Sequence, residues 1–238
     1  MSIAIVGAGF SGAVVARELA EAGHVVEVFE SRDHVAGNCH TRRHETGVMV
    51  HVYGPHIFHT QHEEVWNYVQ RFGEFQPYRH RVRAMVGDQA YQMPMNLGLI
   101  NAFFGTQMNS SEAEAFVNSR ADASITNPQS FEEQGLRLVG RELYDAFFAG
   151  YTRKQWGLDP SQLDKSVTSR IPTRTNTDDR YFTDRFQQMP KAGYTAMFER
   201  MVESNEISPS FTASDREVEL CRARSRMGLP YFSSPICR

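Results

Sequence analysis

Four residues near the N-terminus have the types and the spacing that bind a dinucleotide. Gly7, Gly9 and Gly12 form a Gly-x-Gly-x-x-Gly turn, and Glu30 lies eighteen residues after the last of them. The first glycine permits a tight turn, the second lets a diphosphate approach the backbone, and the third lets a helix pack closely on a strand. A helix N-terminus attracts phosphates through its free N–H groups and its dipole. Glu30 can accept hydrogen bonds from an adenosine ribose.

The elements around these residues are predicted to be a strand, a helix and a second strand. Residues 2–6 form an apolar run that suits a buried parallel strand, and residues 25–29 form another. Between them, apolar residues recur at helical spacing from 13 to 20. A glycine turn framed in this way predicts a dinucleotide site in an α/β fold with a Rossmann-like core.

Composition and charge limit the kinds of partner. The 238 residues are 41% hydrophobic and 22% charged, with a formal net charge of -3, which gives no indication of a nucleic-acid partner. No segment reaches the roughly 20 apolar residues that cross a bilayer, so no membrane partner is expected. The three cysteines do not form a disulfide framework, and the expected location is therefore cytoplasmic.

Histidine and cysteine side chains offer two further kinds of chemistry. His56, His59 and His62 are spaced by three, as metal ligands on neighbouring turns would be, but a Gly-Pro pair breaks a regular helix there. No second cluster of ligands completes such a site, and the expected metal is none. Two other roles stay open: packing or hydrogen bonding for most of these histidines, and contact with a cofactor ring for His56. Cys39 has no CxxC partner, which favours an inert buried thiol.

Aromatic residues in the second half of the chain suit either a core or a binding groove. Trp156 lies among polar residues, and an exposed ring there would stack a nucleobase with about 1–3 kcal/mol. Arginines between residues 170 and 185 could form charge-assisted bonds with a diphosphate. Both interpretations stay open for Phe147, Tyr151, Trp156 and Tyr181.

From its N-terminus to about Met201 the chain resembles the UDP-galactopyranose mutase family of flavoenzymes. The matching segments are residues 7–12, 37–38, 53–60, 150–157, 170–172, 179–182 and 190–195. The resemblance implies an isomerase of galactofuranose biosynthesis that interconverts UDP-galactopyranose and UDP-galactofuranose. It also implies bound FAD, which must be reduced because its N5 attacks the anomeric carbon. UDP-galactose is then the partner, and bacterial members suggest a homodimer.

The resemblance assigns roles to individual residues. Arg170, at the diphosphate, and His56, at the isoalloxazine, would be catalytic. Ala36 stands where glycine is frequent, and other members carry Asn in place of His80. The implied cofactor-binding residues are Gly7, Gly9, Ser11, Gly12, Glu30, Ser31, Asn38, His56 and Ile57. The implied substrate-binding residues are His80, Phe147, Tyr151, Thr152, Trp156, Arg170 and Tyr181.

The predicted fold is α/β, with an incomplete Rossmann-like FAD-binding core, a helical inserted domain and a small antiparallel sheet. The predicted parts are an FAD-binding core (1–75), antiparallel strands (76–96), a helical insertion (97–167), a substrate-lining return segment (168–203) and a divergent tail (204–238). Because the family's C-terminal part is not recognisable in this tail, a truncated or frame-shifted chain with poor activity is expected. The alternatives are an amine-oxidase-type flavin oxidoreductase and a nucleotide-binding fragment without turnover.

Overall fold

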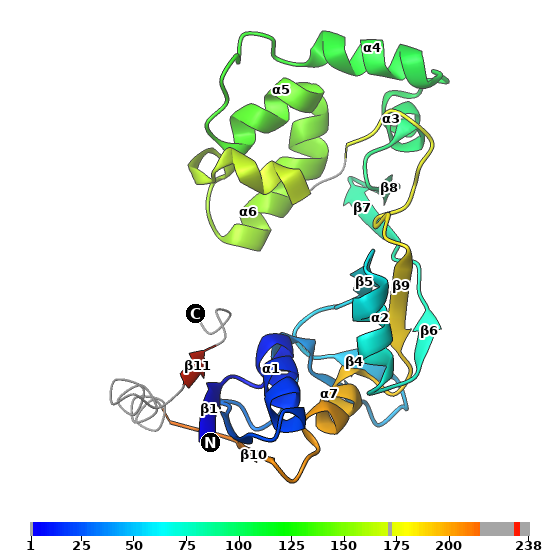
Figure 1. The fold of residues 1–238 in the computed structure, drawn as a ribbon. Coiled ribbons are helices and arrows are strands. Elements are labelled where there is room, and N and C mark those ends of the chain that lie inside the picture. Colours follow the sequence, from blue (N-terminus) through cyan, green and yellow to red (C-terminus); the bar gives the residue numbers. More distant parts are fainter. Residues whose placement is uncertain (1, 171–172, 215–230, 234–238) are drawn as a thin grey trace. The chain divides into compact units, whose positions relative to one another are not determined.

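The chain folds as two compact units (Figure 1). A computed structural model describes residues 2–170, 173–214 and 231–233. Unit 1 is built from residues 1–78 and 184–238, and unit 2 from residues 79–183. The chain therefore leaves unit 1, builds unit 2 and returns, as expected for an inserted domain.

The centre of unit 1 is a parallel sheet with the strand order β10-β2-β1-β11. Its strands are β1 (Ser2–Val6), β2 (Val25–Phe29), β10 (Ile207–Ser210) and β11 (Tyr231–Ser233). Helix α1 (Phe10–Glu21) connects β1 to β2. This β-α-β arrangement confirms the predicted Rossmann-like core. β10 and β11 come from the predicted tail, residues 204–238, of which residues 208–238 have no clear period.

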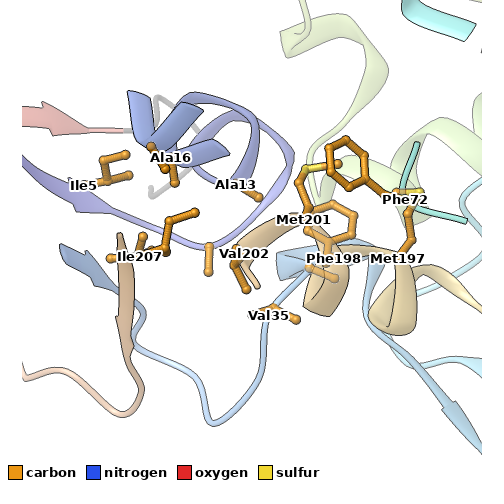
Figure 2. Packing of buried hydrophobic residues seen from close by; sticks show 14 of the residues in the cluster. Ile5, Ala13, Ala16, Val35, Phe72, Met197, Phe198, Met201, Val202 and Ile207 are labelled. Atoms are coloured by element: carbon orange, nitrogen blue, oxygen red, sulfur yellow. The ribbon is translucent and has the colours of Figure 1, made fainter. Parts of the chain in front are cut away.

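Helix α7 (Tyr194–Val202) packs beside α1 and completes the core of unit 1. Figure 2 shows Phe198, Met201 and Val202 among the buried residues of this cluster. Arg17 of α1 holds the end of α7, because its guanidinium donates to the carbonyls of Arg200, Met201 and Glu203 at 2.7–2.8 Å. These are carbonyls of the last helical turn, which have no partner within a helix.

Two further sheets of unit 1 are antiparallel. β3 (Thr41–Arg43) pairs with β4 (Met49–His51). β9 (Phe186–Pro190), which follows unit 2 in the sequence, lies between β5 (Phe58–Thr60) and β6 (Phe75–Pro77). The remaining elements of unit 1 are η1 (Gly37–Cys39) and α2 (Glu63–Gln70).

Unit 2 combines one hairpin with a group of helices. β7 (Val82–Val86) and β8 (Gln89–Met93) pair antiparallel around the predicted Gly87-Asp88 turn, which confirms the small antiparallel sheet. The helical elements are α3 (Leu97–Phe104), α4 (Ser110–Arg120), α5 (Phe131–Tyr144), η2 (Asp145–Ala149), α6 (Gly150–Trp156), η3 (Pro160–Gln162) and η4 (Lys165–Arg170). In the described part of the chain, none of the helices combines the length and the hydropathy of a membrane span.

The helical stripe from Leu136 to Gly150 is interrupted at one glycine. Gly140 has φ = 78°, and a Cβ atom there would lie 2.3 Å from the carbonyl oxygen of Arg120. The left-handed backbone breaks α5 and lets α4 approach it. The spacing of the apolar residues predicts a continuous helix, because this spacing carries no information on where two backbones approach each other.

Candidate functional site

The glycine turn of unit 1 has the geometry that its sequence predicts. Gly7 has φ = 95°, and its N–H donates to the carbonyl of Phe29 at 2.7 Å. A Cβ atom on Gly12 would lie 1.8 Å from the carbonyl oxygen of Gly7, so no other residue fits without moving the backbone. A Cβ atom on Gly9 would approach no other atom closer than 4.0 Å. The space beside Gly9 is therefore open to a ligand.

Glu30 ties the glycine turn to the end of β2. Its side chain is buried, and Oε2 accepts a hydrogen bond from the N–H of Ala8 at 2.7 Å. Oε1 accepts from the N–H of Arg32 at 3.0 Å and from Oγ of Ser31 at 3.2 Å. The carboxylate therefore positions the turn in addition to its predicted contact with a ribose.

The turn that carries Asn38 lies against the glycine turn. Ala36 N–H donates to the carbonyl of Ala8 at 2.9 Å, and a Cβ atom on Gly37 would lie 3.2 Å from Cα of Gly9. Ala36 and Gly37 both have positive φ, of 76° and 52°. The Ala36 methyl group is buried in the core of unit 1, so the structure accommodates this departure from glycine. A left-handed alanine costs about 1–2 kcal/mol.

Two stacked histidines lie beside this turn. The rings of His34 and His40 are 3.7 Å apart at an interplanar angle of 21°. His34 Nδ1 donates to the carbonyl of Val35 at 2.8 Å, which leaves Nε2 to accept from the Tyr53 hydroxyl at 2.9 Å. His40 Nδ1 bonds Oγ1 of Thr195 on α7 at 3.0 Å. The pair therefore connects the turn to α7.

Burial lowers the pKa of His40, and the neighbouring His34 lowers it further, as does Arg42. Asp33 and the Val35 backbone act in the opposite direction. Burial also lowers the pKa of His51, with a second contribution from His56. Both imidazoles therefore favour the neutral form in the folded chain.

We expect stability to fall as the pH drops below about 6.5, the pKa of an unfolded histidine. The unfolded chain then binds more protons than the folded one, whose pKa values at His40 and His51 are lower. The stabilisation is fully present above this pH and is lost below it. Urea unfolding at pH 7.5 and 5.5 measures the difference, and His40→Phe should reduce it. Equal midpoints at the two pH values would contradict the expectation.

His56 and Ile57 line an apolar pocket of about 730 Å3 in unit 1. His56 Nδ1 donates to the carbonyl of Gly54 at 2.9 Å, and its backbone N–H donates to Nδ1 of His51 at 3.3 Å. Cys39 also lines the pocket, and burial raises the pKa of its thiol to about 11. The thiol stays protonated at neutral pH, as an inert cysteine would.

The other two histidines of the spaced set have separate contacts. His59 Nδ1 lies 2.5 Å from Oδ2 of Asp184, and the backbone N–H of His62 donates to Oγ1 of Thr60. Among the residues that the structure describes, no three potential ligands gather around one point where a metal ion would fit.

In unit 2 the predicted substrate residues divide between the core and the surface. Phe147 and Thr152 are buried, and the Phe147 ring lies 5.3 Å from that of Tyr91 in the core. Tyr151 and Trp156 on α6 are 60% and 42% exposed, which leaves their rings accessible for stacking. Phe147 therefore belongs to the core, whereas Tyr151 and Trp156 are accessible to a ligand.

Tyr181 forms the centre of a second aromatic group in unit 2. The ring of His80 meets it edge-on at 5.3 Å and stacks on Phe182 at 5.9 Å. Burial raises the pKa of Tyr181, with a further contribution from Tyr151. Burial lowers the pKa of His80 and favours its neutral form. The structure therefore brings together His80, Tyr181 and Phe182.

The arginines of the return segment have different surroundings. Arg170 is the last residue of η4, and its side chain lies outside the described part of the structure. Arg180 forms a two-pronged ion pair with Asp178, at 2.9 and 3.0 Å. Arg174 lies 3.7 Å from the same carboxylate, and Arg185 pairs with Glu63. Acidic residues therefore already hold three of the arginines that the sequence offers for a diphosphate.

A β-α-β unit with this glycine turn and a buried acid after β2 defines a dinucleotide-binding Rossmann-like domain. Residues 5–72 match the sequence profile of the NAD(P)-binding Rossmann-like domain. Residues 146–222 match the profile of UDP-galactopyranose mutase, which extends beyond Met201 into the segment predicted to diverge.

Two named relatives are similar to most of this chain. The chain is 53% identical to a probable UDP-galactopyranose mutase of Klebsiella pneumoniae over 208 residues, 87% of this chain and 54% of the relative. It is 47% identical to a dTDP-fucopyranose mutase of Escherichia coli over 206 residues, 86% of this chain and 55% of the relative. Over the segment that it shares with them, the chain is similar to UDP-galactopyranose mutases. It spans about half the length of these relatives.

Solved structures show the same fold. A crystal structure of reduced UDP-galactopyranose mutase matches 88% of this chain and 48% of its own chain, with a TM-score of 0.67 and 16% identity. The oxidase alternative has weaker support. An (S)-6-hydroxynicotine oxidase of Paenarthrobacter nicotinovorans is 31% identical over 99 residues, 38% of this chain and 23% of the oxidase.

Proposed function

We propose that the chain acts as a UDP-galactopyranose mutase, which holds FAD on unit 1 and a UDP-sugar on the exposed aromatic rings of unit 2. The observation that carries the proposal is the 53% identity with the Klebsiella relative across both units. The expected compartment is the cytoplasm, and the expected assembly is a homodimer.

The residues of unit 1 fit a dinucleotide cofactor. A Cβ atom on Gly9 would occupy open space, which suits the close approach of a diphosphate. Glu30 and Ser31 would hold the adenosine end, Ser11 and Asn38 the central part, and His56 with Ile57 the isoalloxazine. When bound and reduced, the flavin supplies N5 as the nucleophile for the anomeric carbon of the sugar.

The residues of unit 2 fit a nucleoside diphosphate. Tyr151 and Trp156, which are exposed, would stack on the uracil ring, and the buried Phe147 and Thr152 would complete the uridine groove. Tyr181 and Arg170 would hold the diphosphate and stabilise the charge that develops on the leaving UDP. His80, beside Tyr181, would contact the substrate as a neutral imidazole.

Replacing Trp156 with alanine should weaken UDP binding about tenfold, since a stacked base contributes roughly 1–3 kcal/mol. The ring is 42% exposed, so the fold should not change. A calorimetric titration with UDP measures the loss of affinity. Leu158→Ala is the matched control, because Leu158 is 48% exposed and lies just after the same helix. Equal UDP affinity of Trp156→Ala and the wild type would contradict the proposal that Trp156 stacks on the uracil ring.

Turnover by this chain alone is expected to be slow, and FAD binding weak. It spans 54% of the Klebsiella relative, whose remaining residues have no counterpart in the alignment. The chain, incubated with dithionite-reduced FAD and UDP-galactopyranose, should form UDP-galactofuranose slowly and without net consumption of reductant. Rapid conversion would contradict the expected poor activity, and stoichiometric oxidation of a substrate would favour the oxidase alternative.

A second nucleotide sugar is a candidate for the substrate. The relative named dTDP-fucopyranose mutase is 47% identical to this chain, close to the value for the UDP-galactopyranose relative. Both names describe a pyrimidine nucleoside diphosphate joined to a hexopyranose. Parallel titrations with UDP and dTDP distinguish the two, and our proposal requires the higher affinity for UDP. Binding of neither nucleotide would favour a chain without a substrate groove.

A further inference from the structure

Arg32 is a charged residue on the predicted cofactor edge of unit 1 that has no assigned role. It lies two residues after Glu30, at the carboxyl end of β2, where ligands of open α/β sheets bind. Its guanidinium lies over the ring of Tyr53, 4.3 Å from the ring centroid. Nη2 donates a hydrogen bond to Oδ1 of Asn38 at 2.9 Å.

The backbone of Arg32 is held from two sides. Its N–H donates to the Glu30 carboxylate at 3.0 Å, and its carbonyl accepts from the N–H of Thr212 at 3.1 Å. Glu30 also binds Ala8 in the glycine turn. The turn with Asn38 in turn lies against Gly9. Arg32 therefore belongs to a closed ring of contacts around the edge where the diphosphate of a dinucleotide would lie.

The guanidinium is incompletely satisfied in this arrangement. Nη1 is buried and has no hydrogen-bond partner in the structure. An unpaired buried N–H is costly, and a charged one more so. A phosphate group offers the acceptor oxygens that a guanidinium binds in pairs. Tyr53, which lies against the guanidinium, is 45% exposed.

We propose that Arg32, two residues after the acid predicted to hold the adenosine ribose, binds the adenosine-side phosphate of the dinucleotide and, through Asn38, positions the turn that closes over it. The inference rests on the proposed binding of FAD and is independent of mutase activity.

The test compares FAD with FMN, which lacks the adenosine monophosphate half of FAD. Flavin-free chain is titrated with each flavin, and quenching of flavin fluorescence gives the dissociation constants. Arg32→Gln should weaken FAD about tenfold or more, as loss of a charged hydrogen bond does, and leave FMN within about twofold. Arg32→Lys keeps the charge but not the paired N–H groups, and should recover part of the loss.

Arg43→Gln is the matched control, because Arg43 is an exposed arginine whose guanidinium donates to the carbonyl of Gly47. It should leave both affinities unchanged. An equal loss for FAD and FMN in Arg32→Gln would overturn the proposal in favour of a purely structural role, and so would unchanged FAD affinity. If Arg32→Gln does not fold, Arg32→Lys decides by the same comparison. FAD binding without isomerisation would refute the mutase and leave the role of Arg32 intact.

Discussion

Replacing Gly12 with alanine is expected to destabilise unit 1 by roughly 3 kcal/mol or more. The new Cβ atom would lie 1.8 Å from the carbonyl oxygen of Gly7 and 3.0 Å from its carbonyl carbon. These are backbone atoms, and they cannot move without opening the turn that Gly7 N–H closes onto Phe29. Urea denaturation followed by circular dichroism measures the loss.

The matched control lies in the same turn. Gly9 has φ = -77° and ψ = -172°, which alanine adopts without strain, and its Cβ atom would approach nothing closer than 4.0 Å. Gly9→Ala should therefore unfold at the wild-type urea concentration, although it fills the space meant for the diphosphate. A Gly12→Ala chain as stable as Gly9→Ala would show that α1 does not pack on β1 as described.

Glu30→Ala should have the second largest effect, a loss of about 2–3 kcal/mol. It removes the acceptor of the Ala8 N–H, which lies in a completely buried residue, and that of the Arg32 N–H. The glycine turn loses its side-chain tie to the residue after β2 and keeps only the Gly7–Phe29 backbone bond, so FAD binding should weaken as well. Urea denaturation and flavin titration measure the two losses.

Glu30→Gln separates these contributions. Its amide oxygen keeps one acceptor for the backbone, and we expect it to recover most of the stability. Its NH2 group cannot accept from a ribose hydroxyl, so FAD affinity should recover less. Wild-type stability of Glu30→Ala would contradict the positioning role of the carboxylate.

Local patterns were sufficient to predict the first half of the Rossmann-like core. Strand, glycine turn, helix and acid are consecutive in the sequence, and Gly7 and Gly12 have backbone requirements that glycine alone meets. The edge strands β10 and β11 were not predictable in the same way. Their pairing depends on backbone hydrogen bonds to β2 and β1, which leave no period in a run of three or four residues.

The site was predictable only where a residue type implied its role. Aromatic residues at helical spacing indicate burial and stacking equally well, and the structure was needed to separate buried Phe147 from exposed Trp156. Arg32 was missed because a single arginine in a polar loop has no pattern. Its place two residues after the β2 acid was the available signal. Its contact with Tyr53 is long-range, and its contact with Asn38 depends on how the loop between them folds.

The central claim is that unit 1 is a binding site for FAD, and titration of the purified flavin-free chain with FAD tests it most directly. The glycine turn, Glu30 and the Asn38 turn together predict saturable binding of one FAD per chain, weaker for FMN and abolished in Gly9→Ala. Saturable binding that Gly9→Ala leaves unchanged would contradict the account, and so would a wild-type chain that binds no FAD.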